Sequence, residues 1–201
     1  DTVARLGSSA GIIGGVADDG FGACLLDRLR RDGVDVSRVM RASSGATAVA
    51  FVAYNEDGSR NFIYHIDGTP AVVVDGEPFV DSRAKFFHVM GCSLMANDSF
   101  RLRIVDSVRE ARDLGAKISF DPNIRVELLG GRSLMEVIGP VLDRTSILLP
   151  GESELRLIGG CGDVVAIYNP NFLRIETMQE IVAAVEGGAS LTGVIIEKPL
   201  G

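Results

Sequence analysis

The sequence predicts an α/β protein built on a parallel sheet, and three observations support this fold class. Short apolar runs alternate with segments of helical periodicity along the chain. The apolar runs are continuous rather than alternating with polar residues, which is typical of strands that helices cover on both faces. The 201 residues, 46% of them hydrophobic, suffice for one sizeable domain with its own core.

The order of elements follows from these runs. The apolar run at 11–16 predicts a strand, and the pattern at 21–31 predicts a helix with one apolar face. Gly115 suits the C-terminal cap of a later helix, and Pro140 is expected to interrupt another. The remaining strands are expected at 85–90, 116–120, 146–149 and 193–196. The remaining helices are expected at 99–114, 134–142, 152–158 and 177–186.

A predicted β-hairpin interrupts this alternation. Two strand-like runs, 46–54 and 60–66, are joined by 55–59, a polar link with an Asp-Gly pair that is typical of tight turns. The first run is apolar on both faces, so one face is suited to cover a site and the other to meet a partner subunit. The alternative is that both runs extend the main sheet as antiparallel strands.

Charge and cysteine content narrow the class of function. The net charge of -7 and the pI near 4.9 argue against nucleic acid as a partner. No apolar stretch reaches the ~18 residues of a transmembrane helix, and the first residues do not resemble a signal peptide, so no membrane partner is expected. Cys24, Cys92 and Cys161 are far apart and are interpreted as reduced thiols of a cytoplasmic protein. His65 and His88 are too scattered for a metal cluster.

Polar residues follow three of the predicted strands. Ligands of open parallel sheets bind beyond the carboxyl ends of the strands. The three exits carry residues 91–93, 121–125 and 150–154. Arg125 is suited to two-pronged pairing with a carboxylate or phosphate, and Glu154 to holding a magnesium-bound water or a phosphate.

The second exit also has a purely structural interpretation. Asp121 and Asn123 can cap a turn around Pro122 without touching any ligand. Arg125 can then be an ion-pair residue on the surface. The spacing alone leaves both interpretations open.

Two common nucleotide-binding motifs are missing from the sequence. There is no G-x-x-x-x-G-K-[ST] stretch, which argues against a P-loop enzyme. The segment 160–162 (Gly-Cys-Gly) lacks the strand and the acidic partner of a dinucleotide fingerprint. No Ser/His/Asp arrangement stands out either.

The segment 11–39 resembles the ribokinase-like (PfkB) sugar kinases, which carry a G-x-V-G-x-D-x-F-G stretch, a helix and then G-V-D. Ala17 stands where the family usually has Gly. The matching residues are Gly14, Val16, Asp19, Phe21, Gly22, Gly33, Val34 and Asp35.

Two later segments strengthen the resemblance. The segment 120–129 (FDPNIRVELL) is similar to the D-P-N-x-R segment of the fructokinase, tagatose kinase and 2-keto-3-deoxygluconate kinase branch. The segment 148–155 (LLPGESEL) lies where the family has an N-x-x-E motif, with Glu154 in place and Gly151 replacing the Asn. The resemblance covers almost the whole chain and is weakest over 159–188.

The resemblance implies a ribokinase-like three-layer α/β sandwich with a mostly parallel central sheet and a small β lid. The α/β core would comprise 1–45 and 67–201, incomplete at both ends, and the lid would be the hairpin 46–66. The implied reaction is transfer of the γ-phosphoryl group of ATP, with Mg²⁺, to a hydroxyl of a ketose or sugar acid. Since the family's lid often builds a dimer, a homodimer through the lid is expected.

The resemblance also implies roles for individual residues. Asn123 and Arg125 would contact the sugar, and Glu154 would organise Mg²⁺ and the phosphates. Tyr64 and His65 of the lid would approach the sugar, with packing inside the lid as the alternative. Related keto-acid kinases tend to have Arg near the position of His65, which argues against a keto-acid substrate.

Two family segments are not found in this sequence. One is an N-terminal strand with a substrate-binding Asp; the other is a C-terminal G-A-G-D stretch whose Asp is the general base and whose amides stabilise the transferring phosphoryl group. No catalytic residue is therefore expected within the chain, while Lys198 would lie close to the nucleotide. Three hypotheses remain: an incomplete sugar kinase, a non-catalytic truncated relative that binds sugar or self-associates through the lid, and a nucleoside kinase of the same fold.

Overall fold

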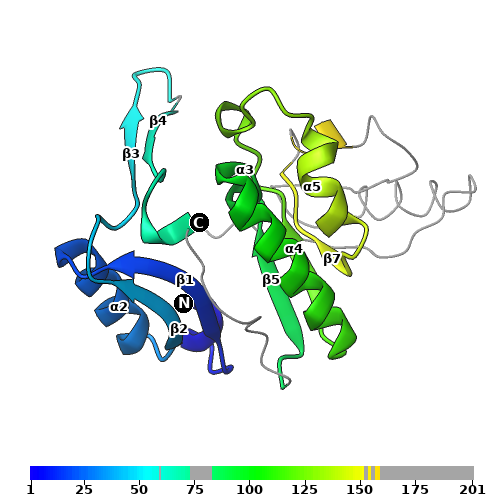
Figure 1. The fold of residues 1–201 in the computed structure, drawn as a ribbon, viewed down its shortest axis with the longest axis horizontal. Coiled ribbons are helices and arrows are strands. Elements are labelled where there is room, and N and C mark those ends of the chain that lie inside the picture. Colours follow the sequence, from blue (N-terminus) through cyan, green and yellow to red (C-terminus); the bar gives the residue numbers. More distant parts are fainter. Residues whose placement is uncertain (59, 73–82, 152–153, 155–156, 159–201) are drawn as a thin grey trace, which may run out of the picture. The chain divides into compact units, whose positions relative to one another are not determined.

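The computed structural model describes residues 1–58, 60–72, 83–151, 154 and 157–158 (Figure 1). These residues form two compact units. The first unit takes in the described residues within 1–79 together with 96–103, and the second takes in those within 80–95 and from 104 onward.

The first unit begins with a short helix α1 (Thr2–Arg5) and is built on a β-α-β segment. Strand β1 (Gly11–Ala17) leads into helix α2 (Gly20–Arg31), and β2 (Asp35–Ala42) returns parallel to β1. Asp19 starts α2, because its carboxylate accepts the N–H of Gly22 at 2.8 Å. The strand and helix predicted here are confirmed, whereas β2 was not predicted.

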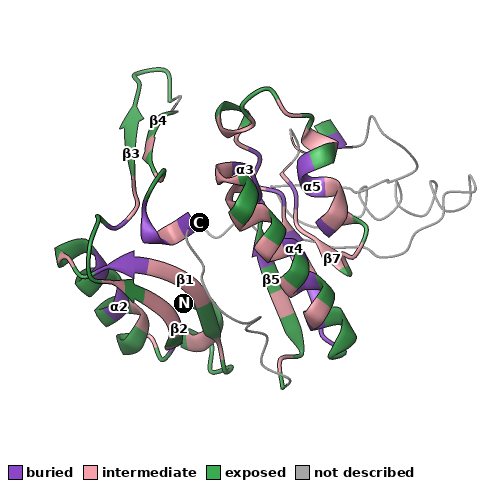
Figure 2. Cartoon of the chain, viewed as in Figure 1, coloured by how far each residue is buried: buried purple, intermediate pink, exposed green. Residues whose placement is uncertain are grey.

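The predicted hairpin is also confirmed. Strand β3 (Val49–Tyr54) pairs antiparallel with β4 (Arg60–His65), so that Val49 lies opposite His65 and Ala50 opposite Tyr64. In the described part of the chain these strands form a two-stranded sheet of their own rather than an extension of the β1-β2 sheet. Most of β3 is exposed, as Figure 2 shows.

The hairpin returns to β1 through a 3₁₀ turn, η1 (Pro70–Val72). Buried Thr69 directly precedes this turn. Both its N–H and its hydroxyl donate to the carbonyl of Ile66, at 3.1 and 2.6 Å. The turn packs directly on β1: a Cβ added at Gly15 would lie 2.1 Å from the carbonyl oxygen of Pro70. Glycine is therefore required there by the close approach of two backbones.

The second unit contains a parallel sheet of three strands. Its order is β5 (Phe86–Met90), β6 (Lys117–Asp121), β7 (Ile147–Leu148). Both strand pairs are parallel, so the carboxyl ends of all three strands lie at one edge. The family-implied class, an α/β fold with mostly parallel strands, is confirmed.

Helices cover one face of this sheet. They are α3 (Cys92–Ala96), α4 (Asp98–Asp113), of which the residues from 104 onward belong to this unit, and α5 (Leu134–Leu142). The core forms where these helices meet β6, with Phe120, Ile118, Leu94, Val108, Val137 and Val141 fully buried. On the opposite face, Phe86 and Met90 are 56% and 48% exposed.

One helix end in this unit agrees with the prediction from the sequence, and another does not. Gly115, with φ of 87°, ends α4 as predicted, and the next N–H, of Ala116, returns to the carbonyl of Ala111 at 2.8 Å. The interruption predicted at Pro140 is wrong, because α5 runs through it to Leu142. A proline in the last turn removes only one helical hydrogen bond, and the Asp143 N–H still bonds the carbonyl of Gly139.

Two short elements of this unit were not predicted: the helix α3 and a 3₁₀ turn, η2 (Val126–Leu128). Residues 154, 157 and 158 are helical, in agreement with the predicted helix at 152–158. The helix predicted at 177–186 and the strand at 193–196 lie outside the described residues. No helix in the described ranges combines the length and the apolar character that crossing a membrane requires.

Candidate active site edge

The exits of β5 and β6 are in direct backbone contact. The N–H of Gly91, the residue after β5, donates to the carbonyl of Asp121 at 2.7 Å. A Cβ added at Gly91 would lie 2.0 Å from the carbonyl oxygen of Pro122. The Gly in the first predicted exit therefore lets the two exits pack together at the carboxyl edge of the sheet.

The turn after β6 is built by its own side chains. Asp121 ends the strand, and its Oδ1 accepts the N–H of Asn123 at 3.1 Å. Asn123 has φ of 38°, in the left-handed region that Asn tolerates better than most residues, and Pro122 between them is fully buried. The structural interpretation of Asp121 as a turn cap is confirmed. It leaves the half-buried side chain of Asn123 compatible with a binding role.

Glu154 connects the exits of β6 and β7. Its Oε1 accepts the N–H of Ile124 at 2.6 Å, and its Oε2 accepts the N–H of Gly151 at 2.7 Å. The second bond runs from a helical Glu back to the N–H three residues earlier, as in a capping box. The structure thus brings Glu154 to the loop that carries Asn123 and Arg125, as an anchor of the backbone.

Arg125 is half-buried at this edge. Its backbone N–H donates to the Sδ of Met95 at 3.3 Å, and its Nη1 donates to the carbonyl of Ile124 at 3.1 Å. Arg125 is thus in contact with neighbouring groups and is not simply a residue of the outer surface. A guanidinium carries five N–H donors in a planar fork, a donor set that suits an anionic or hydroxyl-rich ligand.

Electrostatics at this edge are dominated by two carboxylates. Burial raises the pKa of Asp121, and the nearby charge of Glu154 raises it further, while the hydrogen bonds from Asn123 lower it. Burial also raises the pKa of the Cys92 thiol, against an opposing effect of Arg125. Burial and the neighbouring Glu154 thus act together on the pKa of Asp121.

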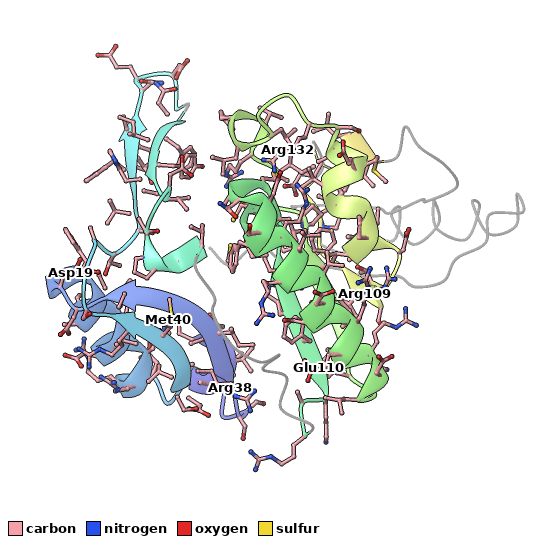
Figure 3. All side chains as sticks on the ribbon, viewed as in Figure 1. Asp19, Arg38, Met40, Arg109, Glu110 and Arg132 are labelled. Atoms are coloured by element: carbon pink, nitrogen blue, oxygen red, sulfur yellow. The ribbon has the colours of Figure 1, made fainter. Side chains whose placement is uncertain are left out.

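Arg132 was not predicted to belong to this region. Its Nε donates to the carbonyl of Leu129, and its Nη2 donates to the carbonyls of Leu128 and Met95, all at 2.7 to 2.8 Å. Arg132, labelled in Figure 3, lies beside α3, and its bond to Met95 connects the end of that helix to the loop after Arg125. Nothing local in the sequence distinguishes such an Arg from a surface residue, because its partners are backbone carbonyls up to 37 residues away.

Tyr64 and His65 lie next to each other on β4 and therefore point to opposite faces of the hairpin. Tyr64 stacks on Phe62, with ring centroids 5.7 Å apart, and its buried hydroxyl has no hydrogen-bond partner among the residues that the structure describes. His65 is exposed and meets Phe51 edge-on at 6.0 Å. Each face of the hairpin therefore carries one of these two residues, so Tyr64 and His65 cannot contact the same ligand from one face.

Glu154 is the residue to which the family resemblance assigns Mg²⁺, and its surroundings show whether it suits that metal. Within the described ranges, no group of three or more His, Cys, Asp and Glu side chains is arranged to hold a metal ion. Mg²⁺ commonly needs only one or two carboxylates, with water and phosphate oxygens completing its shell. Each oxygen of Glu154 keeps a further lone pair beside its backbone bond, so the residue fits a water-mediated role. Lys198, the other predicted nucleotide contact, lies outside the described residues.

Comparison with known proteins finds relatives that match most of this chain. The family model described as pfkB family carbohydrate kinase matches residues 1–196. Fructokinase-1 of Zea mays is 32% identical over 166 residues, which cover 81% of this chain and 51% of that protein. Fructokinase of Escherichia coli is 29% identical over 160 residues, covering 79% and 52%. The chain thus spans about half the length of these relatives.

Solved structures agree with the sequence matches. Fructokinase from Xylella fastidiosa superposes with a TM-score of 0.74 at 25% identity, covering 99% of this chain and 58% of that one. An E. coli protein provisionally assigned as ribokinase II, in complex with ATP and Mg²⁺, gives a TM-score of 0.67 at 32% identity, covering 98% and 58%. The ribokinase-like fold implied by the motifs is therefore confirmed.

Proposed function

This chain belongs to the pfkB family of carbohydrate kinases, and from that premise we propose that its full coding product transfers the γ-phosphoryl group of ATP to a hydroxyl of a ketose. A fructose-like sugar is the first candidate, because the fructokinases of Zea mays and Escherichia coli are 32% and 29% identical to this chain. A sugar acid is the second candidate within the same branch. The non-catalytic relative and the nucleoside kinase are not favoured by these matches.

The fixed loop after β6 is the observation that carries this proposal. Asn123 and Arg125 follow the buried end of β6, and the backbone between them is held by Glu154. A guanidinium on a fixed backbone binds sugar oxygens with less loss of conformational entropy than one on a mobile loop. We assign both residues to sugar binding.

The hairpin residues divide between two roles. The buried hydroxyl of Tyr64, which has no hydrogen-bond partner within the described ranges, supports a contact to a sugar hydroxyl, since such a group gains free energy when it finds a partner. His65 lies on the other face, beside the exposed Phe51, and Ile63 on that face is 60% exposed. We propose that Tyr64 approaches the sugar and that the face of His65 meets a second copy of the chain in a homodimer. Under this proposal the hairpin 46–66 is a lid and the remainder is the α/β core.

ATP and Mg²⁺ are the proposed cofactors. When bound, Mg²⁺ would neutralise phosphate charge during the transfer. Glu154 fits a water-mediated contact to the metal, and Lys198 remains a proposed nucleotide contact by its family position. We propose no residue of this chain as the general base. A cytoplasmic location agrees with cysteines that serve as free thiols, of which Cys24 and Cys92 are described.

The test is ADP release by the full coding product with Mg²⁺-ATP and a panel of ketoses, sugar acids and nucleosides. We expect phosphorylation of a ketose, with Arg125→Ala raising the KM for the sugar about 10–100-fold, the loss expected for a charged hydrogen bond. Arg109→Ala is the matched control, because Arg109 is exposed on α4 and pairs with Asp106. Folded protein that phosphorylates only nucleosides, or nothing, would overturn the proposal.

A further inference from the structure

Three successive backbone N–H groups in the loop after β6 are each bound by a different side chain. The N–H of Asn123 donates to Asp121, that of Ile124 to Glu154, and that of Arg125 to the Sδ of Met95. A loop that satisfies consecutive donors in this way has little freedom at the Cα of Arg125. Its shape is therefore set by residues other than the one that would touch the sugar.

These three bonds differ in strength and in reach. The bond to Asp121 is local, spanning two residues, and sulfur is a weak acceptor. The bond to Glu154 is short at 2.6 Å, is charge-assisted, and spans thirty residues. It is the bond among the three that connects this loop to the segment after β7.

The second oxygen of Glu154 completes the connection. It accepts the N–H of Gly151, and Gly151 stands where the family pattern has Asn. A Cβ at Gly151 would lie 3.4 Å from that same oxygen, an ordinary van der Waals contact, so this bond does not itself require glycine. A carboxylate accepts both N–H groups, whereas an amide has only one acceptor atom.

We propose that Glu154 is a positioning residue for sugar binding: its carboxylate fastens the Arg125 loop to the end of β7 and thereby sets the approach of Arg125 to the sugar. This role rests on the proposed function of Arg125 and adds to the contact with Mg²⁺ that the family position implies. It makes the affinity for the sugar, and not only that for Mg²⁺-ATP, depend on Glu154.

The test compares Glu154→Gln with Glu127→Gln in the full coding product. Glu127 is an exposed carboxylate of η2, in the same loop, so its variant controls for the loss of one negative charge. We expect Glu154→Gln to reduce the hydrogen-exchange protection of the Ile124 and Gly151 amides about 10-fold or more. We also expect it to raise the KM for the sugar, and to add little to that KM in the Arg125→Ala background. Glu127→Gln should change none of these.

The outcomes separate this role from its alternatives. Unchanged protection at both amides overturns the proposal whatever the activity. Lost protection with a raised KM for Mg²⁺-ATP alone also overturns it, since Glu154 would then serve only the nucleotide. A wild-type protein without sugar kinase activity refutes the proposed function, while the exchange data still decide whether the connection exists. If the variant does not fold, the wild-type amides decide: unequal protection of Ile124 and Gly151 refutes a shared anchor.

Discussion

Asp19 holds Thr47 with both of its carboxylate oxygens. Its Oδ2 accepts the backbone N–H of Thr47 at 2.8 Å, and its Oδ1 accepts the Thr47 hydroxyl at 2.7 Å. The hydroxyl oxygen in turn accepts the N–H of Ala17 at 3.0 Å. The same carboxylate caps α2, where it is labelled in Figure 3. One acid thus joins the end of β1, the start of α2 and the chain that enters the hairpin.

The Thr47 hydroxyl is expected to contribute strongly to stability. Thr47→Val keeps the shape but leaves the N–H of Ala17 without its acceptor, in a site where Thr47 is only 5% exposed. We expect a loss of about 1–3 kcal/mol in the free energy of unfolding, measured by urea denaturation.

The matched control for this prediction is Thr47→Ser. It keeps the hydroxyl and removes only a methyl group, which should cost about 1 kcal/mol. Equal or greater loss in the Ser variant would show that packing, rather than the hydrogen bonds, sets the effect.

The acid dependence of stability should depend on Asp19. Hydrogen bonds from the Thr47 backbone first, and then from Gly22, lower the pKa of Asp19 below its ordinary value. A folded pKa below the unfolded one gives stability that is present above the unfolded pKa and lost as pH falls through the folded pKa. In urea titrations between pH 7 and pH 3, Asp19→Asn should therefore be most destabilising near pH 7, with a difference that shrinks toward acid.

A variant of an exposed acid serves as the comparison. Glu56 lies in the exposed turn of the hairpin, so Glu56→Gln should not reproduce this pattern. A destabilisation by Asp19→Asn that is the same at every pH would contradict the assigned cause.

The sequence predicts the strands and helices that bury apolar residues in a clear period, and fails where that signal is weak. Strand β2 was missed because its residues, DVSRVMRA, alternate charged and apolar side chains without one continuous apolar run. Helix α3 has only five residues, too few for a helical period to be visible.

The sequence predicted Arg125 and Glu154 at the strand exits, but it predicted neither Arg132 nor the bonds that connect these exits. The strand exits and the D-P-N-x-R segment pointed to Arg125 and Glu154 from the sequence alone. That Glu154 would accept the N–H of Ile124 depends on how β6 and β7 pair, which brings together residues thirty positions apart. The same holds for Asp19 and Thr47, 28 positions apart. Such contacts are products of the tertiary fold, and no local pattern encodes them.

Asp121 should give the opposite pH dependence to Asp19. Burial, and then the charge of Glu154, raise the pKa of Asp121. A folded pKa above the unfolded one means that the native state binds more protons, so stability falls as pH rises between the two values. Asp121→Asn keeps an oxygen for the N–H of Asn123 and removes the charge. Its stability relative to wild type should rise from acid toward neutral pH.

The pH series designed for Asp19→Asn measures this effect as well. A relative stability of Asp121→Asn that falls toward neutral pH would mean that the Asp121 carboxylate has a stabilising partner beyond Asn123. In the Glu154→Gln background the rise should be smaller, since one of the two causes of the raised pKa is gone.

Two glycine-to-alanine substitutions should change stability in opposite directions. At Gly91 a new Cβ would lie 2.0 Å from the carbonyl oxygen of Pro122, a backbone atom that cannot move aside without shifting the exit of β6. At Gly20, the first residue of α2, a new Cβ meets nothing within 4 Å. We expect Gly91→Ala to lower the free energy of unfolding by about 1–3 kcal/mol, the cost of overpacking. Gly20→Ala should raise it by about 0.5–1 kcal/mol, because alanine restricts the unfolded chain and favours helix.

The same two variants also distinguish effects on stability from effects on sugar binding. Gly91 supports the backbone next to Asp121, so Gly91→Ala should weaken sugar binding together with stability, whereas Gly20→Ala should leave binding unchanged. Calorimetric sugar titrations on the full coding product, beside its urea denaturation curves, measure both. A Gly91→Ala protein that is less stable but binds sugar normally would show that the exit of β6 tolerates a shift, and would place the sugar contact away from this edge.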